Sequence, residues 1–136
     1  RTMQDDPHYD DVRAEVAAFL GERARAAEAA GVGRSSICVD PGLGFGKTYD
    51  HNLQLLGDLD RLTAAGYPVL VGTSRKGFLG AILAGAGQES RPHERDPATA
   101  ATVALAIAGG ASIVRVHNVS HALQEARTAD AIVRAS

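Results

Sequence analysis

Hydrophobic residues in the first third of the chain predict a helix followed by a strand. From Asp10 to Ala30 the spacing is helical, and Gly31 is a natural C-terminal stop. The next segment, SSICVD (35–40), is short, apolar and rich in β-branched residues, which is typical of a buried strand. One stripe of the predicted helix contains Val12, Val16, Phe19, Leu20 and Arg23.

The rest of the chain repeats this alternation. Leucines at helical spacing predict a helix over 50–66, with Leu53, Leu56, Leu59 and Leu62 on one face. YPVLVG (67–72) and SIVRVH (112–117) are typical of strands, and the polar, Gly- and Pro-rich segment 85–97 is typical of a surface connection. Further helices are expected over 78–85, 97–110 and 119–135. Strands that alternate with helices predict an α/β fold with a parallel sheet and right-handed crossovers.

Composition narrows the class of protein. The chain has 136 residues, of which 45% are hydrophobic and 22% charged, and its net charge is −2, so it is expected to form one globular domain at most. No basic run indicates nucleic acid or an anionic membrane, and no apolar run is long enough to span a bilayer. A single cysteine and no visible signal peptide favour a reducing cytoplasm. Because the chain begins with Arg1, we expect it to be a piece of a longer protein.

Ionisable residues follow each of the three predicted strands. Asp40 ends the first strand, the loop TSRKG (73–77) follows the second, and Arg115 and His117 end the third. Ligands of α/β proteins lie at the carboxyl ends of parallel strands, which in a (β/α)8 barrel form the active-site face. Three successive strands with such residues therefore predict a functional site.

These residue types suggest a chemistry, although each also has a purely structural interpretation. Arg115 and His117 lie two apart on a strand and would form an anion site for phosphate or pyrophosphate, unless Arg115 only pairs with a nearby carboxylate. Asp40 can accept hydrogen bonds from a heterocycle or cap a turn. Lys76 can contact a ring carbonyl or remain solvated, and Ser74 can reach a second substrate or bond only the local backbone.

The glycine-rich turn DPGLGFGKT (40–48) fits no phosphate-binding fingerprint, since Pro41 stands where a P-loop needs its first glycine. Its glycines would permit a left-handed turn or a close approach to a flat ligand. The chain has only two lysines, Lys47 and Lys76, among 14 basic residues, which suggests positions where an ammonium is needed; Lys47 has no assigned role. The histidines and cysteine show no spacing typical of zinc, and no nucleophile elbow is present.

Three motifs, DPGLGFGKTYDHNLQLL, PVLVGTSRKGFLG and IVRVHNV, resemble in this order the dihydropteroate synthase family, as does TMQDDPHYDDV near the start. The resemblance covers nearly the whole chain. It implies that residues 1–136 are a single partial domain, the C-terminal three βα units of a pterin-binding (β/α)8 TIM barrel. The family condenses 7,8-dihydropterin pyrophosphate with p-aminobenzoate, releases pyrophosphate with the help of Mg²⁺, and is the target of sulfonamides.

The resemblance also implies roles for individual residues. Asp40 matches the aspartate that binds the pterin edge, and Lys76 the lysine that contacts the pterin. Arg115 matches the arginine stacked on the pterin near the phosphates, and His117 the histidine that binds pyrophosphate. Lys76, Arg115 and His117 are therefore the expected catalytic groups.

For p-aminobenzoate, Phe45 matches an apolar wall of the pocket and Ser74 a polar contact, while Gly44 lets the turn lie close to the ligand. No metal ligand is expected in this chain, since the main Mg²⁺ ligand of the family would lie outside it. Full-length members are homodimers. Asn118 stands where the family commonly has Asp, which removes a charge that could orient His117 or support Mg²⁺.

Two other functions stay open on sequence grounds. One is a pterin-binding barrel that transfers a methyl group from a folate to a corrinoid, and the other is an inactive pterin-binding paralogue. The SRKGFLG loop and RVH favour the synthase, because an anion site suits a pyrophosphate leaving group. The 136 residues alone are expected to be inactive and to aggregate or require the rest of a barrel.

Overall fold

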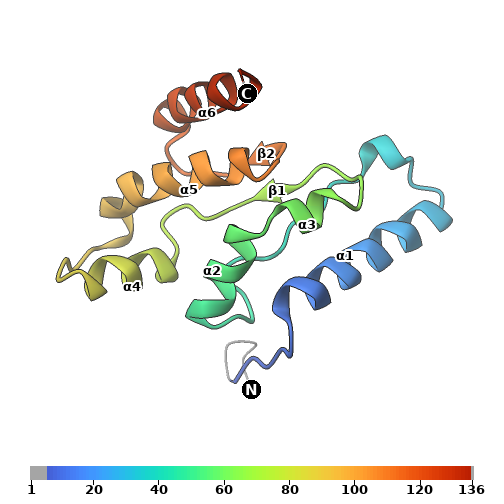
Figure 1. Cartoon of the computed structure of the whole chain (residues 1–136), viewed down its shortest axis with the longest axis horizontal. Helices are drawn as coiled ribbons and strands as arrows, with labels where there is room; N and C mark the ends of the chain where they lie inside the picture. The colour runs from blue at the N-terminus through green and yellow to red at the C-terminus, as the bar shows by residue number, and fades with distance from the viewer. Residues whose placement is uncertain (1–5, 136) are drawn as a thin grey trace.

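A computed structural model describes residues 6–135 as helices arranged around a short parallel β pair (Figure 1). The part of the TMQDDPHYDDV motif before residue 6 lies outside the described residues. The elements in chain order are α1 (Val12–Ala29), the 3-10 turn η1 (Arg34–Ser36), α2 (Tyr49–Gly57), α3 (Asp60–Thr63), β1 (Leu70–Val71), α4 (Gly77–Gly85), the 3-10 turn η2 (Pro92–Arg95), α5 (Asp96–Ala108), β2 (Ile113–Val114) and α6 (Val119–Arg134).

The strands pair in parallel, as predicted, but they are much shorter than expected. β1 and β2 pair in parallel, with Leu70 opposite Ile113, and Val39 forms an isolated parallel bridge to Val69. The predicted strand 35–40 is therefore reduced to one bridge, and its first two residues lie in η1. Pro68 explains the limit, because it has no N–H to continue the ladder. The Ile37 N–H donates to the Arg34 carbonyl at the end of the 3-10 turn.

Helix α1 forms where it was predicted, but its buried face differs from the predicted stripe. Asp11 caps it by accepting hydrogen bonds from the N–H groups of Arg13 and Ala14. Val12 and Val16 are buried as expected, whereas Phe19 is 59% exposed and Arg23 is also exposed. The buried row continues through Ala24 instead, because residues four apart stay aligned on a helix while Phe19 lies on its flank.

The single helix predicted over 50–66 is broken into α2 and α3 at Asp58, whose backbone is not helical (φ −135°, ψ 41°). The Asp58 carboxylate lies 2.7 Å from Arg61 Nε and 3.6 Å from Arg13 Nη1, so ion pairs on both sides stabilise the break. Leu59 and Leu62 remain buried across it.

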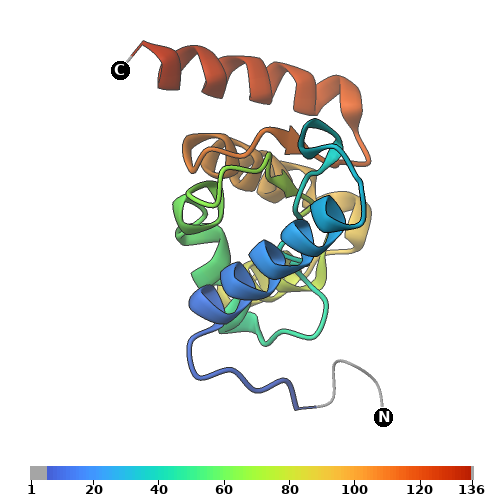
Figure 2. The same ribbon diagram turned by 90° about the vertical axis from the view of Figure 1, so that its right-hand side faces the viewer.

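The remaining helices match their predicted ranges, except that the connection 85–97 contains η2 and that α5 begins at Asp96. Helix α6 packs along α5, and Figures 1 and 2 show it on the opposite side of the β pair from α1. The core between α1, α2, α3 and the strands is made of Val12, Val16, Val39, Leu43, Leu55, Leu56, Leu59, Leu62, Tyr67, Val69 and Val71, with Ala24 and Ala106.

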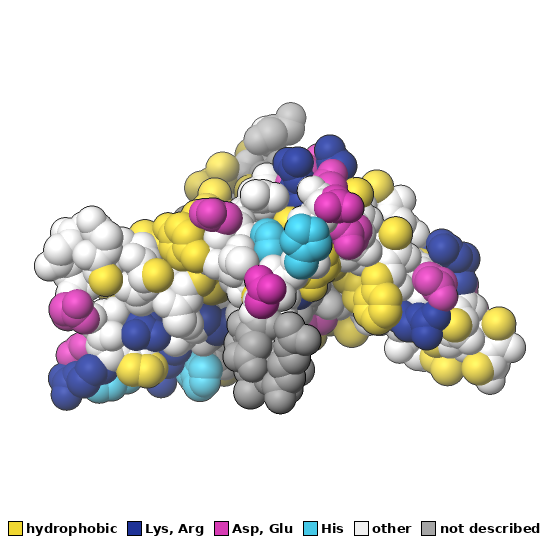
Figure 3. Space-filling view, turned by 90° about the horizontal axis from the view of Figure 1, so that it is seen from below, with side chains coloured by type: hydrophobic (Ala, Val, Ile, Leu, Met, Phe, Trp, Pro, Cys, Tyr) yellow, Lys and Arg dark blue, Asp and Glu magenta, His cyan; other side chains and the backbone are white. Residues whose placement is uncertain are grey.

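The surface is mixed in character. On the side of α1, α2 and α4, charged side chains of both signs are interspersed with hydrophobic ones (Figure 3). Within residues 6–135, no helix combines the length and hydrophobicity that crossing a bilayer requires.

Candidate functional site

The three segments that follow the paired positions meet at one cavity. It has a volume of about 190 Å³ and is lined by the side chains of Phe45, Ser74, Lys76, Arg115 and His117, with Gly72 and Val116. These side chains come from the glycine-rich turn, the loop after β1 and the segment after β2. Arg115 and His117 lie beyond the end of β2 rather than within it, contrary to the predicted strand 112–117, yet both still face the cavity.

The glycine-rich turn is folded by contacts with its own backbone. Asp40 Oδ1 accepts a hydrogen bond from the Gly42 N–H at 2.8 Å, which is the turn-capping role considered from the sequence. Lys47 Nζ donates to the carbonyls of Gly42 and Phe45 at 3.3 and 3.1 Å. Gly42, Gly44 and Gly46 have φ between +56° and +80°, a conformation that glycine adopts without strain.

A buried polar side chain that sequence reasoning missed fixes this turn to α2. Asn52 is 3% exposed; its Oδ1 accepts the Gly44 N–H and its Nδ2 donates to the Thr48 carbonyl, both at 2.6 Å. The available signal was an asparagine beside the leucines of an amphipathic helix, where a polar group must find partners.

Lys76 joins the loop after β1 to the glycine-rich turn. Its ammonium donates to the Leu43 carbonyl and lies 4.5 Å from the centre of the Phe45 ring, so it is not simply solvated. A Cβ on Gly44 would lie 2.8 Å from Lys76 Cδ, so this approach requires a glycine. Burial lowers the pKa of Lys76, with nearby Asp40 opposing the shift and Arg115 and Lys47 adding to it.

Arg115 lies opposite Asp40. Its Nη2 is 3.6 Å from Asp40 Oδ2, so the pairing considered from the sequence is present. The Arg115 side chain remains 61% exposed and can exchange this partner for a ligand. Gly72 lies directly beneath it, since a Cβ there would be 3.0 Å from Arg115 Nη2. Burial also lowers the pKa of Lys47, with Asp40 opposing the shift. Arg115, Lys76 and Lys47 outnumber the carboxylate of Asp40 at this end of the sheet, which makes it suited to an anion.

Ser74 holds His117. Ser74 Oγ lies 2.8 Å from His117 Nδ1 and also accepts the backbone N–H of His117 at 3.2 Å. The hydroxyl has a second lone pair, so the contact with Nδ1 permits either direction; with the hydroxyl donating, Nδ1 is the acceptor. The neutral ring then carries its proton on Nε2, as a hydrogen-bond donor for an anion. Ser74 therefore lines the cavity and bonds to His117, and its hydroxyl does not serve only the local backbone.

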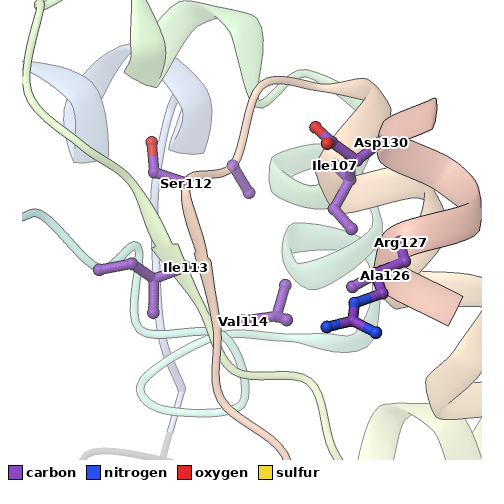
Figure 4. Close-up of a pocket in the computed structure, with 8 residues that line it drawn as sticks. Ile107, Ser112, Ile113, Val114, Ala126, Arg127 and Asp130 are labelled. Atoms are coloured by element: carbon purple, nitrogen blue, oxygen red, sulfur yellow. The ribbon is translucent and has the colours of Figure 1, made fainter. Parts of the chain in front are cut away.

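Two other cavities lie near these elements. One of about 460 Å³ borders the glycine-rich turn on its α1 side and includes Asp40, Lys47, Tyr9 and Phe19 in its lining. Another of about 240 Å³ lies between α5, β2 and α6, where Ile107, Val114, Arg127 and Asp130 face it (Figure 4). The second contains no predicted site residue.

A metal has no ready set of ligands in the part of the chain that the structure describes. No group of three or more His, Cys, Asp or Glu side chains gathers there as a metal ion would need. The described residues therefore do not fit a Mg²⁺ site made of protein ligands alone.

Comparison with known proteins gives a consistent result. Residues 1–117 match the family described as pterin binding enzyme. A dihydropteroate synthase of Mycobacterium leprae is 53% identical over 114 residues, which is 83% of this chain and 40% of the relative. A Streptococcus pyogenes dihydropteroate synthase is 48% identical over 85% of this chain and 42% of its own length, so the chain spans less than half of these curated relatives.

Solved structures agree with this comparison. The Yersinia pestis dihydropteroate synthase with a sulfonamide drug superposes with a TM-score of 0.91 at 34% identity, covering 98% of this chain and 47% of that chain. The Xanthomonas albilineans dihydropteroate synthase in complex with 7,8-dihydropteroate gives 0.85 at 44% identity, over 93% of this chain and 47% of that one. The α/β arrangement described above is thus the fold of about half of these structures.

Proposed function

The chain belongs to the pterin binding enzyme family, and from this premise we propose that it forms the C-terminal part of a dihydropteroate synthase. The reaction would join p-aminobenzoate to 7,8-dihydropterin pyrophosphate and release pyrophosphate. We further propose that residues 1–136 are a single partial domain, the last three βα units of a (β/α)8 barrel. The order of elements and the match to about half of solved synthases support this.

The observation that carries the proposal is the convergence of Lys76, Arg115 and His117 on one cavity, with Asp40 paired to Arg115 at its edge. Negative charge grows on the pyrophosphate as its bond to the pterin methylene breaks. A guanidinium and an Nε2–H imidazole already held in place would stabilise that charge without rearrangement. No protein nucleophile is required, because the amine of p-aminobenzoate attacks the pterin carbon.

The remaining roles follow from position. Asp40 would exchange its Arg115 contact for the amino-pyrimidine edge of the pterin, while Gly42 keeps its carboxylate oriented. Lys76 would contact the pterin while its stem and the Phe45 ring form a wall of the p-aminobenzoate pocket. Gly44 allows this close packing, and Ser74 positions His117 at the same cavity.

The test uses the full-length natural protein that contains this chain. Isothermal titration with 7,8-dihydropterin pyrophosphate, followed by an assay for dihydropteroate, should show binding and turnover. Arg115→Ala should weaken the titration, whereas Arg127→Ala, an arginine at the cavity of Figure 4, should leave it unchanged. Failure to bind would overturn the proposal. Binding without turnover would indicate the inactive paralogue, and methyl transfer from a folate would indicate the corrinoid methyltransferase.

We propose in addition that the full-length protein is a homodimer. Exposed apolar side chains on the last two helices support this, since Leu105 is 60%, Val119 66% and Ile132 65% exposed. Light scattering coupled to gel filtration should give twice the protomer mass, and a monomer at micromolar concentration would contradict it.

A further inference from the structure

The loop after β1 is supported by Arg95, the last residue of η2, and by the first half of α5. Arg95 Nη1 donates to the carbonyls of Arg75 and Lys76 at 3.2 and 3.4 Å, and Thr99 Oγ1 accepts the Arg75 N–H at 3.2 Å. Thr73, the first residue of the loop, has its hydroxyl 2.7 Å from that of Thr102, and both residues are buried. Hydrogen bonds therefore hold the loop that carries Ser74 and Lys76 against η2 and the first half of α5.

One carboxylate connects this loop to the segment after β2. Asp96 Oδ1 and Oδ2 accept hydrogen bonds from Arg75 Nε and Nη2 at 2.8 and 2.9 Å. Asp96 Oδ2 also accepts from Asn118 Nδ2 at 3.3 Å. Arg75 is the neighbour of Ser74, and Asn118 is the neighbour of His117. Ser74 and His117 are hydrogen-bonded to each other, and Asp96 bonds to the sequence neighbour of each one.

The backbone of the loop shows why such an anchor is needed. Arg75 has φ +61°, a left-handed conformation that is unfavourable for a residue with a side chain. This turn leaves Ser74 and Lys76 at the cavity while the Arg75 side chain reaches Asp96 on the other side. The paired Arg75 lowers the pKa of Asp96 to about 2, so the carboxylate is ionised at any pH at which the enzyme would be assayed.

We infer that Asp96 is a positioning residue of the active site, which holds Ser74 and His117 in their hydrogen-bonded arrangement through Arg75 and Asn118. Asp96 does not line the cavity that holds Lys76 and Arg115. The inference rests on the proposed function only where activity is the readout. Its sequence signal is weak, since Asp96 precedes a proline at a helix start and reads as an ordinary acidic residue in a first turn.

The experiment compares Asp96→Asn with Glu94→Gln in the full-length protein that contains this chain. Glu94 is a matched control, because it pairs with Arg91 at 2.7 Å and has a pKa lowered to about 2, but it contacts neither site loop. Asp96→Asn should lower kcat by about 10-fold or more, the scale expected when a catalytic group is misplaced. KM for p-aminobenzoate should change less, and Glu94→Gln should stay within twofold of wild type.

A second readout needs no catalysis. With 15N-labelled histidine, His117 in the wild type should show the Nε2–H tautomer, with Nδ1 accepting from Ser74. Asp96→Asn should produce a mixture of tautomers at His117, and Glu94→Gln should not. An inactive wild type would then count against the proposed function, while the tautomer comparison would still test this inference.

A third variant covers the case in which Asp96→Asn does not fold. Arg75→Lys keeps the charge but removes the two-point pairing, so it should show a smaller loss of kcat in the same direction. Asp96→Glu should restore part of the activity. Folded Asp96→Asn or Arg75→Lys enzyme with wild-type kcat and an unchanged His117 tautomer would overturn the inference.

Discussion

Gly72→Ala should shift the guanidinium of Arg115 while leaving Arg115 itself unchanged. A Cβ at position 72 would lie 3.0 Å from Arg115 Nη2 and 3.1 Å from Nε. These contacts are shorter than an ordinary van der Waals separation, so the guanidinium must move by a few tenths of an ångström. Gly72 does not have a left-handed φ, so the backbone itself accepts alanine.

The expected effect is on ligand binding and not on stability. A hydrogen bond between charged groups contributes about 1.5–3 kcal/mol, and a displaced guanidinium would lose a fraction of that, about 1 kcal/mol. This corresponds to roughly a 5-fold weaker Kd for 7,8-dihydropterin pyrophosphate. The free energy of unfolding should be unchanged or raised by up to about 1 kcal/mol, because alanine has less backbone entropy to lose than glycine.

Isothermal titration of the full-length protein, with urea unfolding in parallel, measures both quantities. Gly57→Ala is the control, since a Cβ at that position meets nothing within 4 Å. The reasoning would be refuted by unchanged affinity in Gly72→Ala, by equal weakening in Gly57→Ala, or by a loss of stability above about 2 kcal/mol.

Further predictions concern the core, acid and the isolated chain. Leu43 is 1% exposed within the glycine-rich turn, so Leu43→Ala should lower the free energy of unfolding by about 2–5 kcal/mol in urea titrations; a loss below about 1 kcal/mol would contradict this packing. The folded-state pKa of Asp96 is about 2 against 3.8 ordinarily, so its stabilisation is complete above about pH 4 and is lost as the pH falls toward 2. Asp96→Asn should therefore flatten stability measured across that range, and an unaltered acid profile would contradict the pairing. The 136 residues expressed alone should be inactive and aggregate, because Leu105 and Val119 are exposed; a monomeric, cooperative thermal transition would contradict this.

The features that could be predicted from sequence are those set by local patterns. Hydrophobic spacing predicted most of the helices and their alternation with parallel strands. The rule that ligands lie at the carboxyl ends of strands predicted one common edge for Asp40, Lys76, Arg115 and His117. Their contacts across that edge are present, as the 3.6 Å approach of Arg115 to Asp40 shows. Their roles toward substrates stay predictions.

The features that could not be predicted depend on partners distant in the chain. The first strand shortens because Pro68, some thirty residues away, has no N–H to offer it. The break at Asp58 includes an ion pair to Arg13 in another helix, which local spacing does not predict. Asp96 and Asn52 are single polar residues whose importance lies in which loops they reach, and hydrophobic periodicity carries no information about such contacts.

The two lysines are explained by the geometry of the glycine-rich turn. Lys47 donates to the Gly42 and Phe45 carbonyls, and Lys76 donates to the Leu43 carbonyl between them. Both ammonium groups are partly desolvated by this packing, which lowers the pKa of each. A planar guanidinium directs its donors outward in a fixed fork, whereas an ammonium distributes three donors around one small atom. Lys76 can therefore keep its hydrogen bond to Leu43 and still donate a second one, which the proposed pterin contact would use.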